Sequence, residues 1–106
     1  MENTATAPAF TAGPWEYQRQ NEIGLELYDV YPTRGGIRVA EVEGEANARL
    51  IESAPDLYKC ARYLRMVCED RLAIEREERN DPEVIEHYEL LLADATAAIA
   101  KVEGGA

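Results

Sequence analysis

Apolar residues recur with one period before residue 44 and with another after it. Over residues 14–43 apolar and polar side chains alternate, as in the runs 15–18 and 25–28, which is typical of β-strands that bury one face. Turns are expected at 21–24 and 32–36, where glycine can adopt a positive φ. The segment therefore predicts three antiparallel strands in a β-meander. The third strand would include Ile37, Val39 and Val42, with a bulge or with both faces covered where the alternation changes parity.

Beyond this segment the apolar residues return every three or four positions, which predicts helices. The expected helices, by residue number, are 45–53, 55–79 and 82–103. Pro55 and Pro82 fall in first turns, where proline is tolerated, and Asp81 is a good N-cap. The last two helices should form an antiparallel hairpin because the link between them is short. The row expected to be buried on the second helix comprises Leu57, Ala61, Leu64, Cys68 and Leu72.

Residues 1–12 are rich in alanine and threonine and predict a flexible N-terminal arm. Residues 13–106 are expected to form a single α+β domain: a three-stranded antiparallel β-meander, then a short helix and the long helical hairpin. A chain of 106 residues has room for one such domain, and 46% hydrophobic residues can supply its core. Trp15 is expected to be a core residue of the first strand, packed against the helices.

The net charge of −10 is the compositional feature that constrains function most. A general nucleic-acid-binding protein carries a basic surplus, and an acidic membrane surface would repel this chain, so neither is an expected partner. Cys60 and Cys68 lie eight residues apart in a predicted helix, about 12 Å, which is too far for a disulfide. Reduced thiols are therefore expected. Since there is also no run of ~20 apolar residues and no signal-peptide pattern, the sequence predicts a cytoplasmic protein.

Four short motifs occur together: Gly-Pro-Trp at 13–15, Ile-x-Val-Ala-x-Val at 37–42, Ala-Asn-Ala-Arg-Leu-Ile-x-x-Ala-Pro-Asp-Leu at 46–57 and Ala-Ile-Ala-Lys at 98–101. As a set they resemble a family of small uncharacterised proteins of tailed phages and prophages. The Tyr-Lys-Cys run at 58–60 departs from the Leu/Ala-rich continuation of many such sequences. The resemblance implies phage origin, the meander-plus-helices fold and a location in the bacterial host. It implies no activity, cofactor or catalytic residue.

The 46–57 block can also be interpreted from its residues. Ala46 and Ala48 are small enough for a helix to approach the sheet closely, and Leu50 and Ile51 are expected to form its buried face. Asn47 is expected to hydrogen-bond a strand end, with a ligand contact as the alternative.

The sequence offers no constellation for catalysis and none for a metal or cofactor, so the protein is not expected to be an enzyme. His87 stands among glutamates, far in sequence from the cysteines, whereas zinc sites need four closely spaced ligands. Two charged rows remain as candidate sites. The basic row, for an anion or an acidic partner, comprises Lys59, Arg62 and Arg65 beside Tyr58 and Tyr63. The acidic row, a face for a partner, comprises Glu83, Glu86 and Glu89.

The leading interpretation is a small acidic phage accessory protein that acts by binding and inhibits a host nucleic-acid-binding or defence protein. Its carboxylates would stand where phosphates otherwise sit. The alternative is an oligomeric structural protein, or one that holds an anionic nucleotide on the basic row. Apolar residues outside the main helical rows predict a homodimer or larger assembly through the hairpin, with the two charged rows facing each other across a two-fold axis.

Overall fold

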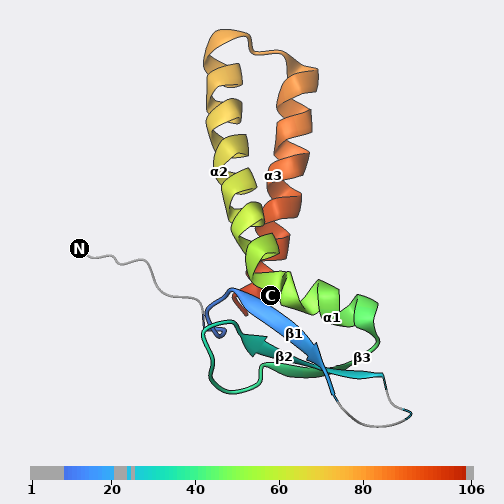
Figure 1. Cartoon of the computed structure of the whole chain (residues 1–106). Coiled ribbons are helices and arrows are strands. Elements are labelled where there is room, and N and C mark those ends of the chain that lie inside the picture. The colour runs from blue at the N-terminus through green and yellow to red at the C-terminus, as the bar shows by residue number, and fades with distance from the viewer. Residues whose placement is uncertain (1–8, 21–23, 25, 105–106) are drawn as a thin grey trace, which may run out of the picture. The chain divides into compact units, whose positions relative to one another are not determined.

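The computed structural model describes residues 9–20, 24 and 26–104, and the chain divides into two compact units, Met1–Leu57 and Tyr58–Ala106. The first, here the sheet unit, contains β1 (Trp15–Arg19), β2 (Leu27–Pro32), β3 (Ala40–Glu43) and α1 (Glu45–Glu52). The second, here the hairpin unit, contains most of α2 (Ala54–Glu78) and all of α3 (Pro82–Val102) (Figure 1). The predicted α+β class and element order are confirmed. Most of the predicted arm, residues 1–8, and the turn residues 21–23 lie outside the described residues.

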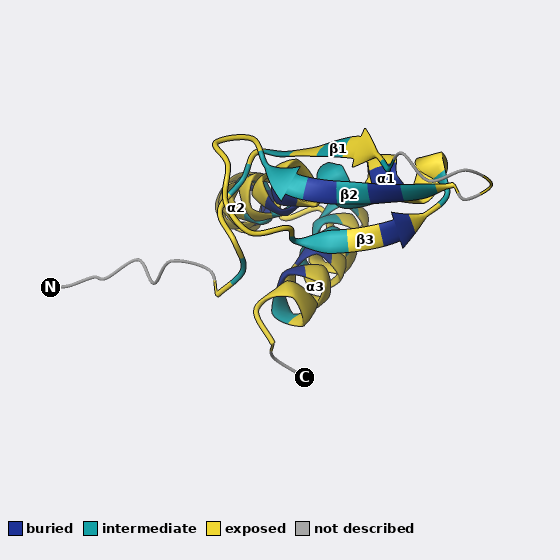
Figure 2. Ribbon diagram, turned by 60° about the horizontal axis from the view of Figure 1, so that its bottom comes forward, coloured by how far each residue is buried: buried dark blue, intermediate teal, exposed yellow. Residues whose placement is uncertain are grey.

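The sheet is antiparallel throughout, with strand order β1-β2-β3. Tyr17 pairs with Val30, and Tyr28 pairs with Val42, so these four side chains share one face. Val30 and Val42 are buried there, and α1 packs over all three strands on this face (Figures 1 and 2). The core of the sheet unit is therefore a single layer between the sheet and one short helix.

The short helix α1 is fixed to the sheet by small and polar residues rather than by large apolar ones. Ala48 is fully buried, and the side-chain amide of Asn47 donates a 2.9 Å hydrogen bond to the carbonyl of Glu43 at the end of β3. The hydrogen bond predicted for Asn47 is thus confirmed. The prediction that Leu50 is buried was wrong, because Leu50 lies about 200° around the helix from Ala48 and is exposed.

The segment before β3 differs from the sequence prediction. Strand pairing begins at Val39, whose N–H donates a 2.7 Å bond to the carbonyl of Val30, and Ile37 is 89% exposed. Gly35 and Gly36 both have positive φ, which carries the chain outward before it returns to the sheet. The prediction that Ile37 belongs to the third strand was wrong for this reason.

Trp15 lies on β1, an edge strand, and is half-buried, so the prediction of a core tryptophan was wrong. Its indole N–H donates a 3.1 Å bond to the carbonyl of Thr11, and the ring of Phe10 meets it edge-on at 6.2 Å between centroids. An edge strand has a neighbour on one side only, and here the segment just before β1 covers part of the exposed ring.

The helices of the hairpin unit meet along one seam with coiled-coil spacing. Side chains that are buried or half-buried recur at alternating steps of three and four, the spacing of a heptad repeat. On α2 this interhelical seam comprises Tyr58, Ala61, Arg65, Cys68, Leu72 and Glu75; on α3 it comprises Ile85, Tyr88, Leu92, Ala95 and Ile99. Leu57 and Leu64, predicted to be buried, each lie one residue before a seam position, about 100° away, and are exposed.

A buried carboxylate closes the turn between α2 and α3. Glu75 is only 3% exposed, its carboxylate lies 3.4 Å from the Arg79 guanidinium, and it accepts a 3.4 Å bond from the N–H of Asp81. Asn80 adopts a φ of 54°, and Asp81 caps α3 by accepting a 3.0 Å bond from the N–H of Glu83. Glu75 therefore helps to fix where the hairpin turns. In the described part of the chain, no helix is both long enough and apolar enough to cross a membrane.

Candidate functional site

Tyr58, the first residue of the predicted basic site, is engaged within the hairpin. Its ring is buried, and its hydroxyl donates a 2.6 Å hydrogen bond to Glu103 at the end of α3. This bond to a carboxylate raises the pKa of the Tyr58 hydroxyl above its ordinary value. Tyr58 therefore acts first as a link between the two helices.

The three cations of the basic row do not converge on one point. Arg65 belongs to the interhelical seam, and the Arg62 guanidinium lies over the Tyr58 ring, 5.7 Å from its centroid. Lys59 is exposed and lies about 120° around α2 from Arg65. Tyr63, also assigned to this site from the sequence, is exposed on α2. The row therefore offers separate positive charges and no single cradle for a nucleotide phosphate.

The acidic row lies on the outer surface of α3, and Glu83, Glu86 and Glu89 are all exposed. Glu89 accepts a 2.7 Å bond from Arg76 of α2, which ties the two helices together. Within the described residues, the side chains of Glu83 and Glu86 form no ion pair. The row thus remains available to a partner at two of its three positions.

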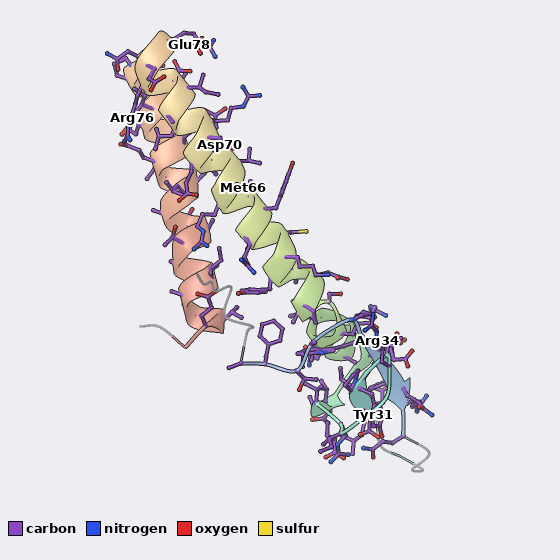
Figure 3. The ribbon with its side chains drawn as sticks, turned by 90° about the vertical axis from the view of Figure 1, so that its left-hand side faces the viewer. Tyr31, Arg34, Met66, Asp70, Arg76 and Glu78 are labelled. Carbon is purple, nitrogen blue, oxygen red and sulfur yellow. The ribbon has the colours of Figure 1, made fainter. Side chains whose placement is uncertain are left out.

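Charge is divided very unevenly along the hairpin unit. Residues 69–94 contain the turn and are called the turn half. They carry ten carboxylates against three arginines. The opposite half is called the open half and comprises residues 58–68 and 95–104. It carries four cationic side chains and one carboxylate. Asp70, Arg76 and Glu78 all belong to the turn half (Figure 3). The hairpin therefore has one strongly acidic half and one moderately basic half.

The sheet unit holds a polar network that the hydrophobic pattern did not predict. The Asp29 carboxylate accepts a 2.9 Å bond from Gln20 and a 2.9 Å bond from Arg38, and Glu41 accepts a 2.6 Å bond from the same Gln20 amide. The Gln20 bond, together with Arg38, lowers the pKa of Asp29. Arg38 thereby ties the loop before β3 to the middle of β2. An aspartate at the centre of an otherwise apolar and aromatic strand was the available signal.

The sheet unit also has two open hollows. One, of about 490 Å³, is lined by polar and aromatic side chains, among them Glu16, Gln18, Tyr31 and Thr33. The other, of about 420 Å³, lies between residues 11–14 and 32–37 and includes Arg34 and the exposed Ile37. Tyr31 and Arg34 are labelled in Figure 3. Neither hollow brings together groups suited to acid–base or nucleophilic chemistry.

Both cysteines are free thiols: Cys68 is buried in the interhelical seam, and Cys60 is exposed. His87 is exposed, with its ring 5.7 Å from that of Tyr88. Among the described residues, no group of three or more histidine, cysteine or acidic side chains is placed to hold a metal ion.

The Gly-Pro-Trp motif and the Ala-Pro-Asp-Leu end of the 46–57 block meet in the sheet unit. A Cβ atom on Gly13 would lie 2.6 Å from the Cβ of Pro55 and 2.9 Å from its Cγ, closer than non-bonded atoms allow. Pro55 is buried in the first turn of α2. These two motifs are thus parts of one packing contact.

The fold and its charged surfaces define a small acidic α+β protein that combines a β-meander with a helical hairpin. The family model described as Salmonella phage P22 protein Y8K6 matches residues 1–106, and the chain belongs to this phage protein family. The resemblance to a phage family is thereby confirmed. Neither the curated proteins nor the solved structures gave a match.

Proposed function

We propose that this phage protein acts by binding rather than by catalysis. In this proposal it occupies a basic surface of a host protein through the turn half of its hairpin and keeps nucleic acid off that surface. The supporting observation is the excess of carboxylates over arginines in residues 69–94, ten against three. A surface of this charge attracts basic proteins over long range and repels nucleic acid itself.

The spacing of the acidic row supports the same proposal. Glu83, Glu86 and Glu89 follow one another at intervals of three residues, a rise of about 4.5 Å per step along α3. Exposed carboxylates at such intervals can meet lysine and arginine side chains that would otherwise contact successive phosphates. Because Glu83 and Glu86 lack ion pairs within the described residues, a partner would not first have to displace an arginine of the same chain.

The alternative of a nucleotide bound on the basic row has less support. The Arg62 guanidinium lies over the Tyr58 ring, Arg65 is half-buried at the interhelical seam, and Lys59 lies about 120° around α2 from Arg65. Phosphate-binding sites instead need donors that converge on one anion.

The test is capture of host proteins on immobilised protein, compared between two variants of equal charge. One variant carries Glu83→Gln, Glu86→Gln and Glu89→Gln; the matched control carries Glu16→Gln, Glu26→Gln and Glu43→Gln on the sheet unit. The proposal expects a basic, nucleic-acid-binding protein that the control retains, that the first variant loses and that salt releases. Equal retention by both variants, or capture that salt does not weaken, contradicts it.

A further inference from the structure

The helix α2 carries a second stripe with coiled-coil spacing, and all of its residues except the half-buried Val67 are exposed. This outer seam comprises Cys60, Leu64, Val67, Arg71 and Ile74, at steps of four, three, four and three. It lies one residue, and so about 100° around the helix, from the interhelical seam. Leu64 is 46% exposed and Ile74 is 44% exposed. A helix with two such seams is built to contact two neighbouring helices, and α3 occupies only one of them.

The composition of the two seams makes the exposed one unusual. The interhelical seam of α2 includes Tyr58, Arg65 and Glu75, whereas the outer seam is apolar or thiol at every position except Arg71. Soluble monomers rarely leave their more apolar helical stripe in water. The exposure of Leu64 and Ile74 therefore calls for an occupant.

The charge distribution indicates which occupant fits. A two-fold contact brings the same surface of two molecules together, so that surface must complement itself. In an antiparallel arrangement the basic open half of one hairpin lies against the acidic turn half of the other. In a parallel arrangement the two acidic ends of α2 would lie side by side, each with five carboxylates against three arginines in residues 69–79.

We infer that a second copy of this chain covers the outer seam, with α2 antiparallel to α2 of the partner and the two-fold axis near Val67. Val67 is seven residues from both Cys60 and Ile74, so this axis sets Cys60 of one copy level with position 74 of the other. The contact is made by the apolar outer seam and leaves Glu83, Glu86 and Glu89 on the outer surface of α3. It is independent of the proposed host-protein binding, which needs only those carboxylates.

The first test compares two exposed positions of α2 that are two residues apart. Leu64→Glu places a charge in the outer seam, whereas Met66→Glu places the same charge outside it, at a side chain that is 51% exposed and projects from α2 (Figure 3). By sedimentation equilibrium at micromolar concentration, the wild type and Met66→Glu should have twice the 11.9 kDa monomer mass, and Leu64→Glu should be a monomer. Circular dichroism should show the same helix content in all three. A monomeric wild type, or an intact Leu64→Glu dimer, overturns the inference.

The second test measures the direction of the contact with a short bis-maleimide linker. Cys60 and position 74 are about 21 Å apart on one helix, beyond the reach of such a linker within a chain. Ile74→Cys should give a covalent dimer through Cys60 of one copy and position 74 of the other. Adding Cys60→Ser should abolish this product. Cross-linking of the wild type through Cys60 alone would show a parallel contact and overturn the antiparallel arrangement.

Discussion

The hydroxyl of Tyr58 donates a 2.6 Å hydrogen bond to the carboxylate of Glu103, and so joins the first residue of the hairpin unit to the residue that follows α3. We expect Tyr58→Phe to lower the melting temperature by a few degrees, because the buried ring is kept and only the hydroxyl is lost. Glu103→Gln should have a smaller effect, since the amide oxygen can still accept the bond. Thermal melts followed by circular dichroism measure both, and an unchanged melting temperature for Tyr58→Phe would contradict the prediction.

The same bond predicts a dependence on alkaline pH. The bond to Glu103 raises the pKa of Tyr58 in the folded state above its ordinary value of 10.0. Since the neutral hydroxyl is the form that donates, this stabilisation is fully present below pH 10.0 and is lost as the pH rises through the folded-state pKa. The stability difference between wild type and Tyr58→Phe should therefore be constant near neutral pH and shrink as the pH rises through the folded-state pKa of Tyr58.

Removing the buried carboxylate at the hairpin turn should be costly. Glu75→Ala leaves the Arg79 guanidinium and the N–H of Asp81 without this acceptor, and we expect a loss of about 1–3 kcal/mol in the free energy of unfolding. Glu75→Gln should lose less because it keeps an oxygen acceptor. Glu78→Ala, at an exposed position three residues later, is the control and should change stability by less than about 0.5 kcal/mol. Urea denaturation distinguishes the three, and equal effects of the two alanine substitutions would refute a role for Glu75.

The network around Asp29 predicts an acid-dependent contribution to stability. Its pKa is lowered from 3.8, chiefly by the hydrogen bond from Gln20, so the folded state favours the carboxylate. The contribution is present above pH 3.8 and is lost as the pH falls through the lower folded-state pKa. Asp29→Asn should therefore be less stable than wild type at neutral pH and approach it in acid. Urea melts of both proteins repeated across this pH range measure the difference, and a difference that stays the same in acid would contradict the prediction.

The contact between Gly13 and Pro55 predicts a steric effect at position 13. The added methyl group of Gly13→Ala would lie 2.6 Å from the Pro55 Cβ, so the backbone must move, and we expect a loss of about 1–3 kcal/mol. Ala12→Ser, at the exposed neighbouring residue, should be within about 0.5 kcal/mol of wild type. Denaturation followed through the Trp15 fluorescence reports on this unit, and an unchanged midpoint for Gly13→Ala would contradict the close approach.

Periodicity in the sequence predicted the elements well, but it predicted the buried stripe of α2 only in part: Cys68 and Leu72 are buried as expected, whereas Leu57 and Leu64 are exposed. Two stripes of α2, offset by one residue, both have heptad spacing, so the predicted row mixed members of both stripes. The structure buries the more polar stripe because its polar members find partners nearby: Tyr58 bonds Glu103, and Glu75 bonds Asp81. Such pairings depend on where the hairpin turns, which a hydrophobic pattern does not encode.

In the sheet unit, sequence reasoning succeeded where the contact is local. The bond of Asn47 to Glu43 spans four residues, so a helix that follows a strand almost directly was enough to predict it. The bonds from Gln20 and Arg38 to Asp29 each span nine residues and depend on the exact strand register. Ile37 was misplaced because its side chain fits a strand, whereas the two glycines before it turn the chain outward. Of the candidate site, the exposure of the acidic row could be predicted, and the dispersal of the basic row could not.

The approach of Gly13 to Pro55 has a consequence for how this family evolves. Positions 13 and 55 lie far apart in the sequence yet share one small volume, so a larger residue at the first can be tolerated only if the second becomes smaller or its helix begins elsewhere. The two positions should therefore covary across distant relatives. A relative that has lost Gly-Pro-Trp should also have lost Ala-Pro-Asp-Leu, and the joint presence of both motifs is then a marker of shared architecture, whatever partner each member binds.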